Sequence, residues 1–450
     1  MRFRVAIGAL AGVLGCALVA STAAAAPDGI QIRNQTNLAT DAPVNFHDWS
    51  TYRQWLSGDS HGVVANSDDP ANVEIGRPAG TVKYTDPHTG EKRSWEYGVW
   101  TSPRHDLNFG ASELVASWNA TTPAGTWLQV EMQGEYDNGK STPWFVMGRW
   151  AAGDADIKRT TVDKQGDAYS SIWTDTFSID DPDRVRLSAY QLRLTMYRAP
   201  GSDASPEVRM LGAMSSYVPD RFGVEPSQGG IAWGTELVVP RHSQNIHRGN
   251  YPEYGGGGQV WCSPTSTTMV LEYWGRGPSE DDMSWVEPGY VDPQVAHAAR
   301  MTWDYTYEGA GNWPFNTAYA SSFRGMEGRI TRLHSLDEVE LFIKAGIPVI
   351  TSQSFLEEEL PGAGYGTSGH IFVVVGFTSD GDVIVNDPAS SSNDAVRNVY
   401  PREDFEKIWL RTKRHRADGS VAGGSGGIVY LIKPTSKAWP RPVDSANPNW

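Results

Sequence analysis

The stretch GGGGQVWCSPTSTTMVLEYWG, residues 255–275, joins a run of glycines to a cysteine and then to a helical pattern. Apolar residues recur at helical spacing in its second half, and Gly275 is a typical helix terminator. Cys262 stands where this pattern begins, and Pro264 falls in the first turn, where proline is tolerated. Because the N–H groups at a helix N-terminus lower the pKa of a thiol, the stretch predicts a helix that begins with a reactive cysteine.

The N-terminal residues decide which cysteines remain. Residues 1–26 combine two arginines, an apolar run and a series of small residues, the pattern of a secretory signal peptide. Its removal would take Cys16 away and leave Cys262 as the only thiol of a secreted protein. Exported proteins usually pair their cysteines or lack them, so a single thiol indicates a reactive group, an intermolecular disulfide or a small buried side chain. Lipid attachment at Cys16, in a weakly lipoprotein-like VLGC sequence, is the minor alternative.

The composition excludes several partners. The formal net charge of −15 argues against nucleic acid or an anionic membrane as the main partner. After the signal, no segment is apolar for long enough to predict a membrane span. The sequence has no His-Glu-x-x-His motif and no paired His/Cys ligand set, so we expect no metal and no cofactor.

The pattern of apolar, polar and turn-forming residues changes along the chain and divides it into regions. Residues 27–217 contain strand after strand of alternating pattern, separated by Gly, Pro, Asp and Asn, which predicts an antiparallel β-sandwich. Residues 218–237 have the composition of a linker, and residues 437–450 that of a C-terminal tail. Between them, residues 238–436 contain helices followed by short apolar strands, which predicts an α+β domain.

A nucleophilic thiol needs a histidine and a group that orients it. His370 differs from the other histidines because it opens the strongly apolar strand HIFVVVGF. The next strand, VIVN, returns toward the same end and brings Asp387, where an ionised carboxylate would fix the tautomer of the imidazole. The alternative is that His370 is simply a buried histidine at the end of a strand and that Asp387 only forms an Asp-Pro turn. Asn386 is the neighbouring candidate for the orienting group, but its side chain should point to the other face of the strand.

These motifs resemble papain-like cysteine peptidases, and more closely the bacteriocin-leader-processing (double-glycine) peptidases and their secreted relatives. The resemblance rests on CSPTSTTMVLEYWG, SGHIFVVVGF and the Asp-Pro pair, and it extends over roughly residues 238–435. It implies a papain-like fold and a peptide or protein substrate. It also implies Cys262 as nucleophile, His370 as base and acid, and Asp387 as the orienting group of an acyl-enzyme mechanism.

The oxyanion-stabilising glutamine of that family lies typically six residues before the cysteine, where this chain has Gly256. Gln244, in RHSQN, takes the role if residues 245–258 are an insertion, and Gln259 is the alternative. The glycines of 255–258 would then let the backbone lie close to an extended substrate, or would form a flexible insertion.

Two further features concern partners. Of the 18 tryptophans, many fall in the strand-rich half, where most should be core and some could bind a cell-wall polymer. The segment 357–366, EEELPGAGYG, could form a mobile rim of the active cleft. We therefore expect a secreted cysteine peptidase. The alternatives are a cell-wall peptide hydrolase or amidase with the same triad, or a catalytically silent binding protein.

Overall fold

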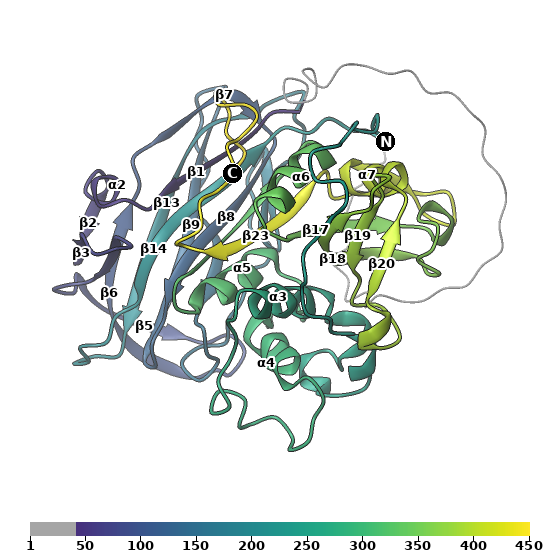
Figure 1. Cartoon of the computed structure of the whole chain (residues 1–450). Coiled ribbons are helices and arrows are strands. Elements are labelled where there is room, and N and C mark those ends of the chain that lie inside the picture. Colours follow the sequence, from purple (N-terminus) through teal and green to yellow (C-terminus); the bar gives the residue numbers. More distant parts are fainter. Residues whose placement is uncertain (1–41) are drawn as a thin grey trace.

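The computed structural model describes residues 42–450 (Figure 1). The predictions made for residues 1–26, the signal peptide and the alternative anchor at Cys16, lie outside these residues. Within residues 42–450 the chain is rich in strands in its N-terminal half and mixes helices with strands in its C-terminal half, as the α+β prediction requires. No helix in this described part is long and apolar enough to cross a membrane.

The N-terminal half forms two seven-stranded sheets in which all pairings between strands are antiparallel. The first has the order β11-β12-β8-β14-β4-β3, with β1 beside β14. The second has the order β10-β9-β13-β6-β2, with β5 beside β6 and β7 beside β13. The strands of the first sheet are β1 (Val44–Trp49), β3 (Val63–Asn66), β4 (Asn72–Ile75), β8 (Glu113–Thr121), β11 (Ser170–Trp173), β12 (Thr176–Ile179) and β14 (Glu207–Ser216). Those of the second are β2 (Asp59–His61), β5 (Gly80–Thr85), β6 (Lys92–Thr101), β7 (His105–Ala111), β9 (Thr126–Tyr136), β10 (Phe145–Trp150) and β13 (Leu187–Arg198).

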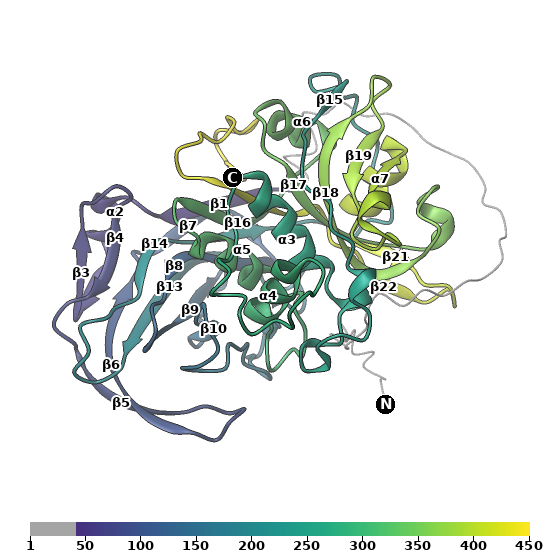
Figure 2. The same cartoon turned by 60° about the horizontal axis from the view of Figure 1, so that its bottom comes forward.

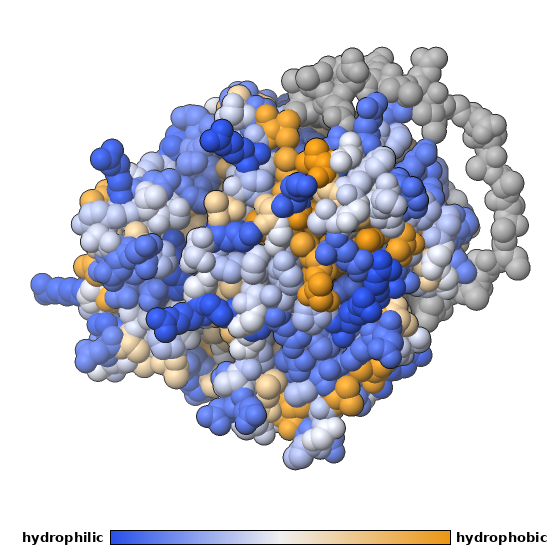
Figure 3. Space-filling model, viewed as in Figure 1, coloured by the Kyte–Doolittle hydropathy of each residue, from blue (hydrophilic) through white to orange (hydrophobic). Residues whose placement is uncertain are grey.

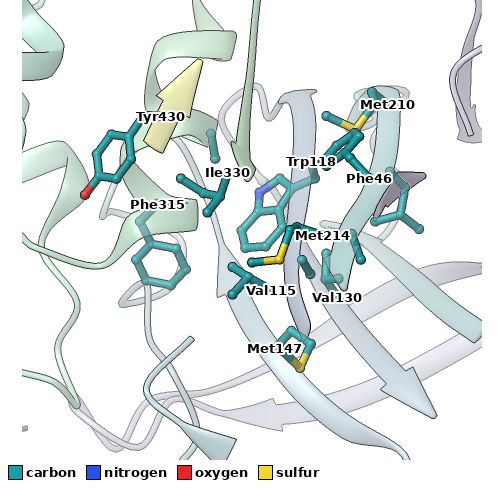
Figure 4. Packing of buried hydrophobic residues seen from close by; sticks show 14 of the residues in the cluster. Phe46, Val115, Trp118, Val130, Met147, Met210, Met214, Phe315, Ile330 and Tyr430 are labelled. Atoms are coloured by element: carbon teal, nitrogen blue, oxygen red, sulfur yellow. The ribbon is translucent and has the colours of Figure 1, made fainter. Parts of the chain in front are cut away.

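The two sheets bury their facing side chains against each other. Trp118 and Met214 of the first sheet and Val130 and Met147 of the second belong to one apolar cluster (Figure 4). The alternation of apolar and polar residues along β13 is what directs one side of the strand into this cluster.

The C-terminal half is built on a third seven-stranded sheet of order β16-β23-β17-β18-β19-β20, with β15 beside β18. Apolar side chains cover both of its faces: Ile371 and Val373 of β18 belong to one cluster, and Phe372 and Val374 to another. Helices α3 and α5 contribute to the first cluster, and α6 and α7 to the second. The strands are β15 (Thr235–Glu236), β16 (Met326–Arg332), β17 (Val349–Phe355), β18 (Thr367–Phe377), β19 (Val383–Asn386), β20 (Arg397–Tyr400) and β23 (Ile428–Pro434); the helices are α3 (Cys262–Tyr273), α4 (Pro293–Thr302), α5 (Trp313–Ser322), α6 (Leu336–Lys344) and α7 (Arg402–Leu410).

The two halves share a continuous core. Figure 2 shows α3, α4 and α5 between the C-terminal sheet and the N-terminal strands. The ring of Phe315 on α5 lies 6.1 Å from that of Trp118 and 5.4 Å from that of Trp150, measured between centroids. The edge strand β16 donates the N–H of Gly328 to Asn119 Oδ1 at 3.1 Å and the N–H of Ile330 to Ser117 Oγ at 3.0 Å. The N-terminal half thus covers a sheet edge that would otherwise expose unpaired backbone groups.

The segment 218–237, which the composition marks as a linker, is packed along α6 and α7. The N–H groups of Gly230 and Ala232 donate to Glu340 Oε2 at 2.9 and 3.0 Å, and that of Ser227 donates to Glu406 Oε2 at 2.7 Å. Because both carboxyl groups are buried, these bonds supply the partners that buried polar groups need. The connection between the halves therefore has a fixed course.

The tail of residues 437–450 is bound to both halves. Phe46 N–H donates to Pro448 O at 2.8 Å, and Asn449 Nδ2 donates to Arg332 O at 3.0 Å. Asn449 is 1 % exposed, and Trp450 packs edge-on against Phe342 at 4.9 Å between centroids. The face of the molecule in Figure 3 is mostly hydrophilic, with apolar residues gathered in a band down its middle.

A shared core predicts shared unfolding. Replacing the fully buried Trp118 by alanine should lower the free energy of unfolding by about 3–5 kcal/mol, and both halves should unfold in one earlier transition in urea. Trp173→Ala is the control, because that side chain is 41 % exposed and should change stability little. Two separate transitions, of which only one is shifted by Trp118→Ala, would contradict a common core.

Candidate active site

Cys262 is the first residue of α3 and is partly exposed, whereas residues 263–271 behind it are buried. One turn further along, Ser266 Oγ donates to the carbonyl of Ile371 in β18 at 3.3 Å. The start of α3 is thereby held against the strand segment that contains His370. The helix predicted from residues 262–275 is present over Cys262–Tyr273.

His370 and Asp387 lie together at one end of the β18–β19 hairpin. The antiparallel register pairs Val373 with Asn386, so Asp387 continues toward the end from which His370 started. His370 Nε2 lies 2.8 Å from Asp387 Oδ1, and both side chains are almost completely buried. Since an ionised carboxylate only accepts hydrogen bonds, Nε2 is the donor.

Two tyrosines complete the surroundings of Asp387. The hydroxyls of Tyr365 and Tyr400 each donate to Asp387 Oδ2 at 2.8 Å, and Ala389 N–H donates to Oδ1 at 2.9 Å. Burial by itself would raise the pKa of this carboxyl, but the charge and hydrogen bond of His370 and the two hydroxyls outweigh it and hold the pKa below its usual value of 3.8. Asp387 is therefore ionised at neutral pH.

The sequence does not reveal either tyrosine. Tyr365 lies in the loop before β18 and Tyr400 ends β20, and their spacing from Asp387 follows no motif. This loop belongs to the segment 357–366, for which a mobile rim of the cleft is expected. Arg411 donates to both oxygens of Glu359, at 2.5 and 2.7 Å, and the Tyr365 side chain is buried, so the segment is anchored at two points.

The two candidate glutamines lie in different settings. Gln244 is fully buried, its N–H donates to Pro388 O at 2.8 Å, and its side-chain amide has no hydrogen-bond partner among the described residues. Gln259 lies half-buried in the turn Gly258–Val260. A buried amide without a partner is costly, and an oxyanion would satisfy its donor.

Asn386 points away from His370, as expected, and donates to Pro240 O at 3.0 Å.

The glycines before Cys262 have a structural role that differs from the two predicted from the sequence, contact with an extended substrate and a flexible insertion. Gly255 to Gly258 all have positive φ angles, between 57° and 82°. A Cβ on Gly257 would lie 2.0 Å from the carbonyl oxygen of His247. The run therefore packs against residues 247–248, and the rings of His247 and Trp261 lie 5.7 Å apart. This close contact brings the segment after Gln244 against the turn that leads into Cys262.

Ser263, the residue after Cys262, also has a partner. Its hydroxyl and that of Tyr430 on β23 lie 2.9 Å apart, and both side chains are fully buried. Burial raises the pKa of Tyr430 well above its usual value, so the phenol stays neutral. This hydrogen bond fixes the first turn of α3 to the sheet of the C-terminal half.

Two family models match this chain. Residues 45–216 match the family model described as the peptidase C39 N-terminal domain, and residues 236–417 match that of the peptidase C39 like family. Together the two matches cover most of the chain, and both families belong to a class of cysteine peptidase. The chain belongs to the peptidase C39 family, the double-glycine type, and the resemblance read from the sequence is confirmed.

Solved structures give weaker similarities. A C39-like peptidase from Bacillus anthracis is 18% identical over 44% of this chain and 98% of its own, with a TM-score of 0.27. A carbohydrate-binding module of the β-sandwich superfamily is 10% identical over 37% of this chain and 56% of its own, with a TM-score of 0.18. These TM-scores are too low for either structure to define the fold here. No curated protein matches the sequence.

The two tyrosine hydroxyls should stabilise the ionised form of Asp387. The double variant Tyr365→Phe/Tyr400→Phe should lower the free energy of unfolding at pH 7 by about 1.5–3 kcal/mol per lost bond to a charged group. A carboxyl whose folded pKa is lowered contributes stability above pH 3.8, and this contribution is lost as the pH falls through the folded pKa. Urea denaturation should therefore show the variant and wild type converging in acid.

Tyr273→Phe is the matched control, because that hydroxyl donates to Gly346 O at 3.1 Å, on another part of the domain. The loss in free energy of unfolding caused by Tyr273→Phe should not depend on pH in the acid range. A deficit of the double variant that is equally independent of pH would show that the hydroxyls do not act through the charge of Asp387.

Proposed function

We propose that this protein is a secreted cysteine peptidase that hydrolyses amide bonds of a peptide or protein substrate through Cys262, His370 and Asp387. Its N-terminal half is then a β-sandwich and its C-terminal half a papain-like domain. The observation that carries the proposal is the buried contact of 2.8 Å between His370 Nε2 and Asp387 Oδ1, beside the helix that begins with a partly exposed cysteine.

The roles of the three residues follow from the direction of that contact. Because Nε2 donates to Asp387, the other ring nitrogen, Nδ1, takes the proton of the Cys262 thiol. The ionised carboxylate favours the protonated imidazole, and the N-terminus of α3 favours the thiolate. The thiolate attacks the amide carbonyl, His370 protonates the departing amine, and water then releases the acyl group from Cys262.

The negative oxygen of the tetrahedral intermediate needs donors. The buried amide of Gln244 is one donor, and the N–H of Cys262, at the start of α3, is the second. We favour Gln244 over Gln259 because its side chain is buried, lacks a hydrogen-bond partner among the described residues, and lies on a segment attached to the loop after Asp387.

The ion pair can be tested by alkylation with iodoacetamide. In the wild type, Cys262 should react fast well below the free-thiol pKa of about 8.5, and His370→Ala should abolish this reaction at low pH. His297→Ala is the matched control, because this histidine is also buried in the domain but bonds to Tyr319 Oη at 3.1 Å. Ordinary thiol behaviour in all three proteins would favour a silent binding protein.

The substrate class needs a parallel assay. Digestion of a mixture of denatured proteins should release new N-termini with the wild type and none with Cys262→Ser. The same pair of proteins should be incubated with purified cell wall. Release of amines from cell wall alone would replace the proposal by that of a cell-wall peptide hydrolase or amidase.

The oxyanion donor can be identified by two alanine substitutions. Gln244→Ala should lower kcat by about 10²–10³-fold, the usual effect of losing one such donor, while the rate of Cys262 alkylation stays unchanged. Gln259→Ala should leave both rates near wild type. The opposite result would assign the role to Gln259.

A further inference from the structure

His242 lies between two helices and two acidic side chains. Its Nε2 is 2.6 Å from Glu272 Oε2 on α3, and its Nδ1 is 3.3 Å from Asp292 Oδ1 at the start of α4. The side chain of His242 is 10 % exposed. The helix that begins with Cys262 is thus connected, near its other end, to a residue two positions before Gln244.

The contacts continue on both sides of His242. Gln294 Nε2 donates to Glu272 Oε1 at 2.8 Å. Asn393 Nδ2 donates to Asp292 Oδ2 at 2.7 Å, and Asn393 Oδ1 accepts the N–H of Ser243 at 2.7 Å. The network therefore joins α3, α4 and the loop after Asp387 through the segment 242–245.

Gln244 depends on this network for its position. Its side-chain amide makes no hydrogen bond to any described residue, so only packing and the backbone hold it. The backbone is held by Pro388 at Gln244 itself, by Asn393 at Ser243, and by the ion pairs of His242. Among these attachments, His242 provides those to the helix of Cys262, through its imidazole to Glu272 and through its N–H to Met269 Sδ at 3.4 Å.

We propose that His242 is a positioning residue for the reaction: as a cation between Glu272 and Asp292, it holds Gln244 at the distance from Cys262 that oxyanion binding requires. This inference rests on the proposed function. His242 touches neither substrate nor reacting atoms, and acts through the segment 242–245.

The charges around His242 support a cation at neutral pH. Burial alone would lower its pKa, but Asp292 and Glu272 outweigh burial and raise the pKa to about 9. His247, which also lies near Asp292, has its pKa lowered by burial to about 4 and is neutral. Tyr290, which interacts with both, has its pKa raised by burial to about 12 and is neutral as well. The stabilising contribution of the ion pairs is complete below pH 6.5 and is lost as the pH rises through about 9.

The test compares two reactions of the same cysteine. Alkylation needs only the thiolate, whereas amide hydrolysis also needs the oxyanion donor and the proton that His370 gives to the departing amine. Because His370 is kept in His242→Gln, the ratio of the hydrolysis rate to the alkylation rate, compared with that of the wild type at the same pH, isolates the oxyanion site. In the wild type this ratio should fall as the pH rises through about 9, where His242 loses its charge. At neutral pH the ratio should be lower in His242→Gln by about 10–100-fold, since displacement of a donor by about 1 Å has effects of that size, and this difference from the wild type should narrow as the pH rises through about 9.

The matched control is His334→Gln, because His334 is also buried and also paired with a carboxylate, Glu338, at 3.2 Å. That pair lies away from Gln244, so the ratio and its pH dependence should remain those of the wild type even if stability falls. Should His242→Gln fail to fold, Glu272→Gln serves instead. It removes one of the two charges, and the fall of the ratio should move to lower pH.

The outcomes separate the two proposals. A wild type that is alkylated fast but hydrolyses no substrate overturns the proposed function and this inference with it. An active wild type with an unchanged ratio in His242→Gln overturns the positioning role alone. A parallel loss of alkylation and hydrolysis in His242→Gln also overturns it, because His242 would then support the fold around Cys262 rather than the oxyanion donor.

Discussion

The candidate site is organised around one buried negative charge. The carboxylate of Asp387 is inaccessible to water, and an isolated charge in such a place costs several kcal/mol. Donors from His370, Tyr365, Tyr400 and the backbone of Ala389 compensate this cost. These groups come from β18, the loop before it, β20 and the loop after β19, so stabilising the charge also fixes the relative positions of these elements.

The same requirement orients the imidazole. With Nε2 directed at Asp387, the ring can turn only Nδ1 toward a substrate or a thiol, and the tautomer is set by the carboxylate. The first turn of α3 is fixed separately, through Ser263 to Tyr430 and through Ser266 to Ile371. Cys262 and His370, the proposed nucleophile and base, are thus held by independent contacts to one sheet, which limits their relative motion.

The N-terminal half contributes to this rigidity. Its side chains cover the edge strand β16, and Trp118 and Trp150 pack on Phe315 of α5. The C-terminal tail crosses back to pair Pro448 with Phe46. The N-terminal half is therefore part of the scaffold of the site.

Local patterns in the sequence determined the helix that begins at Cys262, the apolar strand opened by His370 and the return strand that brings Asp387. These features depend on periodicity, caps and turns, which involve residues close together in the chain. Only the tertiary structure decided that Tyr365 and Tyr400 hold Asp387, that Gln244 is the buried amide, and that the glycine run packs on His247. It also placed the segment 218–237 and the tail, and it revealed α5, because contacts between distant side chains leave no periodic signal in the sequence.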